Sequence, residues 1–231
     1  MSTETALRTY YLAGKADSVA GHESILRGEC LGLVIVEPDQ RAESMRETAD
    51  LLRRARAGDL DAFERLIRQH ERRVFRTALR LLRKGEDAED AAQEVYLRLY
   101  KHLGRLKQDQ DMMPWLYRVT VNVCRDMNRR RERSAAASLT MAERPALEPR
   151  DPAPGPHQQA ADAEEWRIMS RALAALPEKQ QASIVLRDLE GLPEESVARI
   201  LGVSQATVRT HVCRARLRLR DVRRKLLGGK K

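Results

Sequence analysis

Apolar residues recur at helical spacing through the first half of the chain. Over residues 62–82 they return every three or four positions, which is the period of one helix face. Gly85 interrupts this pattern, which resumes over 87–103 and again over 114–131. Pro114 stands in the first turn of the last segment. Proline is tolerated there, because the backbone N–H that it lacks would have no hydrogen-bond partner within the helix. The pattern predicts a bundle of at least three helices.

A second helical pattern occupies the C-terminal part of the chain. Apolar spacing predicts helices near residues 164–175, 178–190, 194–201 and 205–225. Proline favours helix starts and glycine favours helix ends, because glycine accepts the left-handed conformation of a C-terminal cap. Such residues stand at these boundaries: Pro177, Pro193, Gly191 and Gly202. We therefore expect an all-α fold.

The two helical blocks are separated by a proline-rich stretch. Residues 134–163 hold five of the nine prolines and few large apolar residues, so we expect a flexible, partly extended linker. Residues 1–45 have one strand-like run, 31–36, with no partner strand, and we expect this extension to be poorly ordered. The predicted organisation is two small helical domains, 46–133 and 164–231, joined by the linker.

Composition and charge indicate a polyanionic partner. The 231 residues include 43 Lys and Arg against 34 Asp and Glu, which gives a net charge of +9. No apolar run approaches the roughly 20 residues that span a bilayer, and no export signal opens the chain. The three cysteines form no paired motif. We expect a cytoplasmic protein without membrane insertion, and Met45 is an alternative candidate for its first residue.

The sequence contains no recognisable catalytic motif. It lacks a glycine-rich phosphate loop and a GxSxG elbow. His22 and His70 each open a pattern like HExxH, but Leu26 and Val74 stand in place of the second histidine. The histidines show no metal-ligand spacing. We therefore expect no enzymatic activity, no metal and no cofactor.

The segment 194–225 has the pattern of a helix-turn-helix. A short helix, the turn 202–204 and a longer helix follow one another, and Ser204 can cap the second helix. Its predicted buried stripe consists of Val208, Val212, Ala215 and Leu219. Small polar and basic side chains, which suit a DNA major groove, occupy the other side: Thr207, Arg209, Thr210, Arg214 and, on the flank, His211.

The helix predicted over 87–103 has one apolar and one acidic face. The apolar face consists of Ala88, Ala92, Val95, Tyr96 and Leu99. The acidic face consists of Glu86, Asp87, Asp90, Gln93 and Glu94, with Leu97 among them. Because charge steers an encounter and an apolar anchor prolongs it, this face favours a protein partner.

The helix predicted over 114–131 is basic instead. Its predicted buried residues are Leu116, Val119, Val123 and Met127, and we expect Trp115 to pack in the core. Its outward residues are Arg118, Asn122, Arg125 and Arg129, extended by Arg130, Arg131 and Arg133. One acidic and one basic helix indicate two distinct partners, and a solvated bundle surface is the alternative.

Three segments together resemble the extracytoplasmic-function (ECF) sigma factors of bacterial RNA polymerase. These segments are DAEDAAQEVYLRLY at 87–100, PWLYRVTVNVCRDMNRRR at 114–131, and residues 176–220. The helix-turn-helix alone is also similar to that of response regulators, whereas the three segments in this order are specific. The resemblance implies promoter-specific transcription initiation, with core polymerase, promoter DNA and a separate anti-sigma factor as partners.

The resemblance also implies a role for each face. The acidic helix would dock on the β′ clamp helices of the polymerase through Asp87, Glu89, Asp90, Gln93, Glu94 and Leu97. The basic helix and the loop before it would bind and melt the −10 element through Lys107, Gln108, Asp109, Arg118, Asn122, Arg125, Arg129 and Arg130. The C-terminal domain would contact the β flap and read the −35 element through Thr207, Arg209, Thr210, His211, Arg214 and Arg218.

A free-standing regulator that binds operators as a dimer is the alternative function. It would use the same helix-turn-helix and would employ the first block as an effector or dimerisation domain. The acidic helix discriminates between the two, because only a sigma factor needs Asp90 and Glu94 to bind polymerase.

Overall fold

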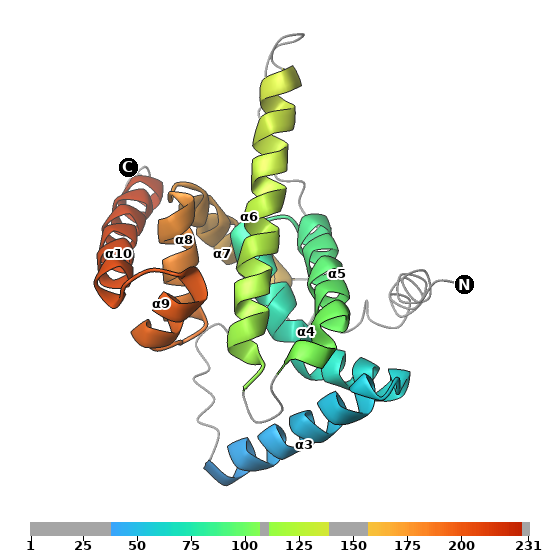
Figure 1. Cartoon of the computed structure of the whole chain (residues 1–231). Helices are drawn as coiled ribbons and strands as arrows, with labels where there is room; N and C mark the ends of the chain where they lie inside the picture. Colours follow the sequence, from blue (N-terminus) through green and yellow to red (C-terminus); the bar gives the residue numbers. More distant parts are fainter. Residues whose placement is uncertain (1–37, 107–110, 139–156, 228–231) are drawn as a thin grey trace.

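The computed structural model describes residues 38–106, 111–138 and 157–227, and the regular secondary structure in these ranges is helical (Figure 1). The first group of elements consists of α3 (Pro38–Arg56), α4 (Leu60–Leu82), α5 (Gly85–His102), the 3-10 turn η1 (Leu103–Arg105) and α6 (Met113–Ser138). The second group consists of α7 (His157–Ala174), α8 (Glu178–Ile184), the π-helical turn η2 (Val185–Leu189), α9 (Glu194–Leu201) and α10 (Gln205–Leu227). The predicted all-α fold is confirmed for these residues.

The first group packs as a bundle around α4. Helices α5 and α6 lie against α4 and against each other, and α3 packs across α4 (Figure 1). Fully buried side chains of the bundle include Leu66, Val74, Val95, Leu99 and Leu116. Burying a side chain of this size stabilises a fold by about 1.5–3 kcal/mol. The predicted apolar faces therefore supply the core.

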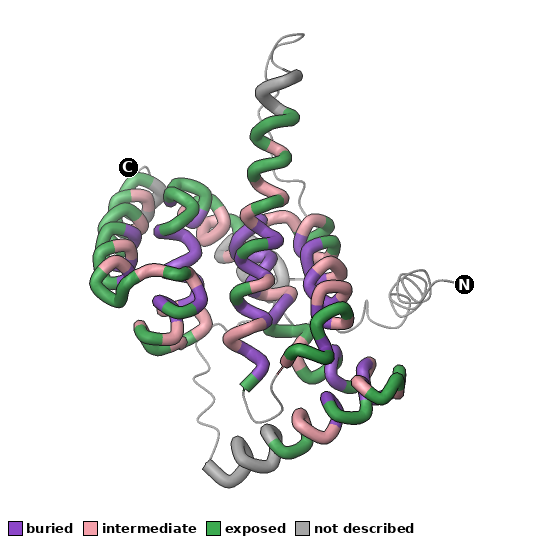
Figure 2. Tube along the Cα trace, in the orientation of Figure 1, coloured by how far each residue is buried: buried purple, intermediate pink, exposed green. Residues whose placement is uncertain are grey.

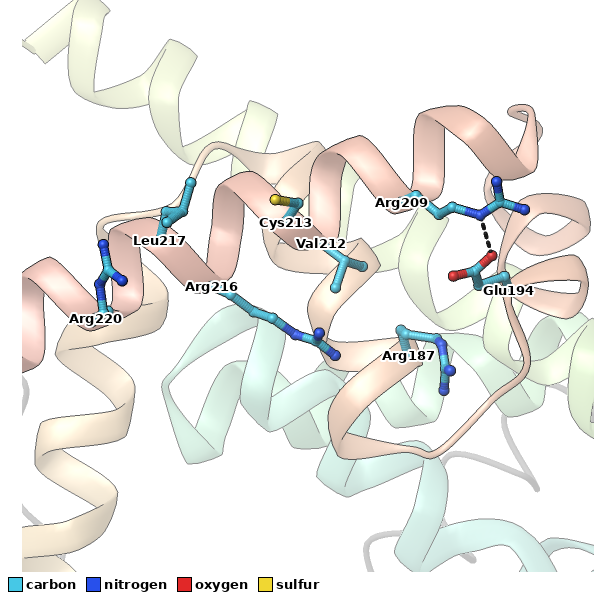
Figure 3. Close-up of a pocket in the computed structure, with 8 residues that line it drawn as sticks. All are labelled: Arg187, Glu194, Arg209, Val212, Cys213, Arg216, Leu217 and Arg220. Atoms are coloured by element: carbon cyan, nitrogen blue, oxygen red, sulfur yellow. Dashed lines mark hydrogen bonds and ion pairs between the residues drawn. The ribbon is translucent and has the colours of Figure 1, made fainter.

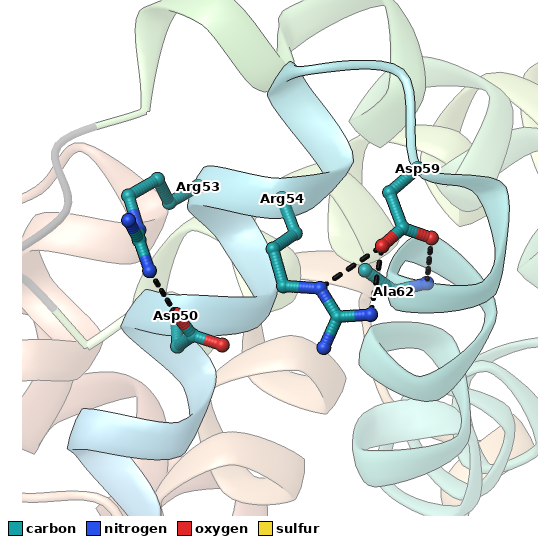
Figure 4. Close-up of polar contacts among 5 residues, drawn as sticks. All are labelled: Asp50, Arg53, Arg54, Asp59 and Ala62. Atoms are coloured by element: carbon teal, nitrogen blue, oxygen red, sulfur yellow. Dashed lines mark hydrogen bonds and ion pairs between the residues drawn. The ribbon is translucent and has the colours of Figure 1, made fainter.

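The turn between α3 and α4 is fixed by Asp59 (Figure 4). One carboxylate oxygen accepts a hydrogen bond from the Ala62 N–H at 3.0 Å and so caps the first turn of α4. The other oxygen accepts from the Arg54 guanidinium at 2.7 Å. The Ala62 N–H and the Arg54 cation hold the pKa of Asp59 below its ordinary value. One turn earlier, Arg53 pairs with Asp50 on the exposed side of α3.

The second group forms a smaller unit around the helix-turn-helix. Helices α8 and α9 pack against α10, and Val185, Val197 and Val208 are fully buried among them. Gly202 ends α9 with φ at 68°, a left-handed conformation that costs glycine little. Ser204 Oγ then accepts from the Thr207 N–H at 3.1 Å. The predicted cap of the second helix is confirmed.

Helix α8 does not continue to residue 190 as a regular helix. From Val185 it widens into η2, in which the Glu190 N–H bonds to the Val185 carbonyl at 2.9 Å. The Leu189 carbonyl meets the first group, where it accepts from Arg80 at 3.2 Å. Turns of the π type often lie at functional positions. Here the wider turn lies at the contact between the two groups.

The two groups of helices pack directly against each other. Helix α6 contacts α9, and α4 contacts both η2 and α7. Figure 1 shows α6 between α5 on one side and the second group on the other. Along the N-terminal half of α6, burial extends beyond the predicted stripe to Tyr117, Thr120, Val121 and Cys124 (Figure 2). The sequence pattern, which predicted two domains on a flexible linker, did not anticipate this contact.

Several boundaries differ from the expected ones. Helix α3 begins at Pro38, upstream of Met45, so the end of the extension that we expected to be poorly ordered is helical. Helix α6 continues to Ser138 and α7 begins at His157, so helices occupy both ends of the expected linker. The strand-like run and the five linker prolines lie outside the described residues. No helix in the described ranges is long and apolar enough to cross a bilayer.

Replacing Asp59 by alanine should lower the Tm more than replacing it by asparagine, because asparagine keeps the capping oxygen and loses only the ion pair with Arg54. The folded-state pKa of Asp59 is lowered, so its charge stabilises the protein above the ordinary aspartate pKa of about 3.9. That advantage over asparagine should disappear as the pH falls through the folded-state pKa.

Thermal unfolding at neutral and acid pH tests both effects. Asp50→Ala is the matched control, because it removes a carboxylate that pairs with an arginine but caps no helix. Equal Tm values for Asp59→Ala and the control at neutral pH would contradict the capping role.

Candidate functional site

The outward face of α10 carries most of the side chains expected to contact DNA. The buried side consists of Val208, Val212 and Ala215, as the helical pattern predicted, whereas Leu219, the fourth predicted member, is half-buried. The exposed side includes Arg209, Thr210, Cys213 and Arg214, and Thr207 and His211 are half-buried on the flank. These side chains therefore lie outside the buried stripe of α10, with Arg209 toward α9 and His211 toward α8.

A shallow hollow lies along the flank of α10 that carries Arg209 and Cys213 (Figure 3). It is lined by Arg187, Glu194, Arg209, Val212, Cys213, Arg216, Leu217 and Arg220. Leu217 is 47% exposed, so the hollow offers one exposed apolar side chain beside four guanidinium groups. Arginine suits phosphate oxygens because its planar fork donates two parallel hydrogen bonds. The hollow can thus accept an anionic backbone.

Two of these arginines already bind carboxylates of the same domain. The Arg209 Nε lies 2.7 Å from Glu194 Oε2, as the dashed line in Figure 3 marks. Arg216 donates two hydrogen bonds to Asp188, each at 2.8 Å, and this pairing raises the pKa of Arg216. Arg187 was missed in the sequence, because only the fold brings the η2 turn beside α10, and Arg216 and Arg220 were not among the named −35 residues. A phosphate must displace the carboxylates to bind Arg209 or Arg216.

Two predicted −35 residues have contacts inside the domain. Arg218 Nη1 donates to Gln180 Oε1 in α8 at 2.9 Å, so its guanidinium is bound to the protein. His211 Nδ1 lies 3.4 Å from Ser183 Oγ. Burial, followed by the nearby cations Lys179 and Arg214, lowers the pKa of His211. The lowered pKa favours the neutral imidazole, which offers one donor and one acceptor.

The acidic face of α5 is present, with one exception. The predicted apolar face is buried: Ala88, Ala92, Val95, Tyr96 and Leu99. Glu86 and Asp90 are exposed, and the half-buried members of the face are Glu89, Gln93, Glu94 and Leu97. Asp87, by contrast, is only 21% exposed and lies 2.8 Å from Arg131 of α6. Its carboxylate therefore faces the neighbouring basic helix more than the solvent.

The basic residues of α6 fall into two sets. Asn122, Arg129 and Arg130 are exposed. Arg118 Nη2 donates to the Arg199 carbonyl of α9 at 2.7 Å, and Arg125 Nε lies 2.6 Å from Glu178 Oε1 of α8. The second group of helices therefore contacts two arginines of the predicted −10 face, Arg118 and Arg125.

The remaining predictions concern the loop before α6 and its first residues. Lys107, Gln108 and Asp109 lie outside the described residues. Asp111 accepts a hydrogen bond from the Met113 N–H at 2.9 Å and so caps α6. Trp115 packs against the hydrophobic core, as expected. Among the residues that the structure describes, no cluster of three or more His, Cys, Asp and Glu side chains could hold a metal ion.

Comparison with known families matches two segments of the chain. Residues 66–134 match the model of sigma-70 region 2, and residues 166–219 match that of sigma-70 region 4. These segments contain the helices of the acidic and basic faces and the helix-turn-helix.

Curated relatives cover most of the chain. The ECF RNA polymerase sigma factor SigM of Mycobacterium tuberculosis is 36% identical over 174 residues, which are 75% of this chain and 83% of SigM. The ECF RNA polymerase sigma-E factor of Escherichia coli is 30% identical over 173 residues, which are 72% of this chain and 88% of that protein.

Solved structures share the fold. CnrH, in complex with the cytosolic domain of CnrY, aligns with a TM-score of 0.57 at 21% identity and covers 80% of this chain and 99% of that chain. RpoE of Bartonella quintana, in complex with the anti-sigma factor NepR, gives a TM-score of 0.54 at 23% identity, with coverage of 73% and 98%.

These matches decide between the two functions that the sequence left open. An operator-binding dimer would share only the helix-turn-helix with sigma factors, whereas both regions match here in the expected order. Sigma factors are initiation factors and not enzymes. The chain belongs to the ECF sigma factors of the sigma-70 family, which direct transcription initiation by RNA polymerase.

Proposed function

We propose that each charged face serves one partner during initiation. The acidic face of α5 docks on the β′ clamp helices of core polymerase, α6 binds the −10 element, and α10 reads the −35 element. The observation that carries this proposal is the placement of one acidic and two basic faces on separate helices. An acidic face repels DNA, so it is left for a protein, and each basic face suits one DNA element.

Docking on polymerase uses the members of the acidic face that point outward. Asp90 is exposed, and Glu94 and the half-buried Leu97 lie on the same face of the helix. Charge of this kind raises the rate of encounter, and the leucine adds apolar contact that slows dissociation. Asp87 contributes less directly, because it is paired with Arg131.

Recognition of the −10 element uses the outward side of α6 and the loop before it. Asn122 can pair with a base edge, and Arg129 and Arg130 can bind phosphates. A flipped base bound near the loop would offset the few kcal/mol that unstacking costs. This would allow melting without nucleotide hydrolysis.

Recognition of the −35 element uses the exposed face of α10. We assign the base contacts to Arg214 and Thr210, which are exposed, and the backbone contacts to the arginines of the hollow. The β flap of the polymerase holds this domain, and a separate anti-sigma factor regulates the protein. It acts in the cytoplasm, where polymerase and chromosome are found.

Run-off transcription tests the proposal as a whole. Core polymerase from the same host is incubated with fragmented genomic DNA, with and without the protein. Discrete new start sites that depend on the protein, preceded by two shared sequence elements, are the expected result. Start sites that share only one element would contradict the assignment of two DNA-reading faces.

Reversing the charge of Asp90 by Asp90→Arg should weaken binding to core polymerase by roughly tenfold or more, because like charges would then face each other at the clamp. Binding is measured by competition with the wild-type protein for core polymerase. Glu71→Arg makes the same change at an exposed position of α4 and is the control. Equal losses in both variants would indicate a general charge effect and would sink the docking assignment.

Arg214→Ala should weaken binding of the holoenzyme to its −35 element by about 1–3 kcal/mol and relax sequence preference at one position. Arg224→Ala, in the last turn of the same helix, removes the same charge and is the control. It should weaken binding evenly across sequences. Binding to a panel of −35 variants measures both effects, and an unchanged preference in Arg214→Ala would disprove a base contact.

A further inference from the structure

Two arginines of the hollow on α10 are paired with carboxylates in different ways. Arg209 uses one nitrogen, because its Nε donates to Glu194 Oε2 at 2.7 Å. Arg216 uses two, because its Nε and Nη2 donate to the two oxygens of Asp188, each at 2.8 Å. Asp188 therefore occupies the donor fork of Arg216. The two terminal nitrogens of Arg209, by contrast, have no hydrogen bond to the residues that the structure describes.

The free end of Arg209 is accessible. Figure 3 shows its two terminal nitrogens directed away from Glu194, which lies beside Nε. The Arg209 side chain is 63% exposed. Cys213, one turn further along α10, is exposed and small, so it leaves room for a planar group beside the guanidinium. Glu194 thus holds one edge of the guanidinium and leaves the other edge open.

This pairing favours a guanine base over a backbone phosphate. The O6 and N7 atoms of guanine accept two hydrogen bonds from one guanidinium in the major groove. This edge of the base is uncharged and needs only the terminal nitrogens, so it can bind while Glu194 stays in place. A phosphate at the same position would be repelled by the Glu194 carboxylate, which already balances the charge of Arg209.

We propose that Glu194 is a positioning residue that directs Arg209 to a guanine of the −35 element, in addition to the contacts of Arg214 and Thr210. This inference rests on the proposed role of α10 at the −35 element. Glu194 fixes the guanidinium through Nε and lowers its attraction for phosphates. Arg209 therefore differs from the other arginines of the hollow, which contact the backbone.

Substitution of Glu194 should change base preference. Holoenzyme made from core polymerase and the full chain is bound to promoter fragments, found by run-off transcription, in which the −35 base pairs are varied one at a time. Arg209→Ala should remove a preference for guanine at one position. Glu194→Ala should reduce the preference at that same position by roughly tenfold, which is within the range that a bidentate arginine–guanine contact supplies.

The salt dependence of binding gives a second readout. Without Glu194, the charge of Arg209 is free to bind a phosphate of any sequence. On a fragment that lacks the −35 element, the plot of log affinity against log salt concentration should become steeper by about 0.9 in Glu194→Ala, the value for one additional phosphate contact. A role confined to the stability of α9 would lower the Tm and leave both readouts unchanged.

Two further variants isolate the contact with Arg209. Glu195→Ala is the matched control, because it removes a carboxylate from the same first turn of α9, where Glu195 lies 3.9 Å from Arg199 of its own helix. Glu194→Gln keeps a side-chain oxygen that can accept from the Arg209 Nε. It should therefore retain more of the guanine preference than Glu194→Ala.

Loss of the guanine preference in Glu194→Ala but not in Glu195→Ala would support the positioning role. Equal changes in these two variants, or equal losses in Glu194→Gln and Glu194→Ala, would overturn it. So would an unchanged preference in a Glu194→Ala protein that is folded, if Arg209→Ala still alters the preference. In these cases the proposed reading of the −35 element by α10 stands. That proposed function itself fails if neither Arg209→Ala nor Arg214→Ala changes any −35 preference.

Discussion

A carboxylate withdrawn from water must be surrounded by cations and hydrogen-bond donors, and Glu190 finds them only when the two domains are together. Arg80 is buried as completely, so leaving either charge in place without the other would cost about 3–5 kcal/mol. Both groups return to water only if the whole contact opens. The buried pair therefore favours this one arrangement of the two groups over the range that a linker alone would allow.

Local patterns in the sequence predicted what depends on neighbours within one or two turns. The buried sides of α5 and α10 and the Ser204 cap follow directly from helical periodicity and capping chemistry. The Glu190 contact could not be predicted in this way, because Arg80 and Tyr117 lie 110 and 73 residues away. Asp87 shows the same limit, since nothing near it in sequence indicates that Arg131 will hold it.

Helix α6 packs against its own bundle on one side and against the second group of helices on the other. This explains both its composition and the burial of residues that the sequence pattern did not predict. The stripe that contains Leu116 and Val123 is apolar, as a bundle core requires. Tyr117 is also buried, but it faces a carboxylate of the other domain and so needs a hydroxyl. Arg118 and Arg125 also bind oxygens of the second group, whereas Asn122, Arg129 and Arg130 are exposed. The freedom of these two arginines therefore depends on how the domains are arranged.

The paired arginines carry a consequence for a protein of net charge +9 in a cell rich in RNA. Glu178, Asp188 and Glu194 act as built-in counterions for three of the arginines. When such an arginine meets a phosphate it exchanges one anion for another, and few salt ions are released to drive the exchange. Random polyanions therefore gain little from binding these sites. Tight binding at these sites therefore requires contacts beyond the pairing of charges.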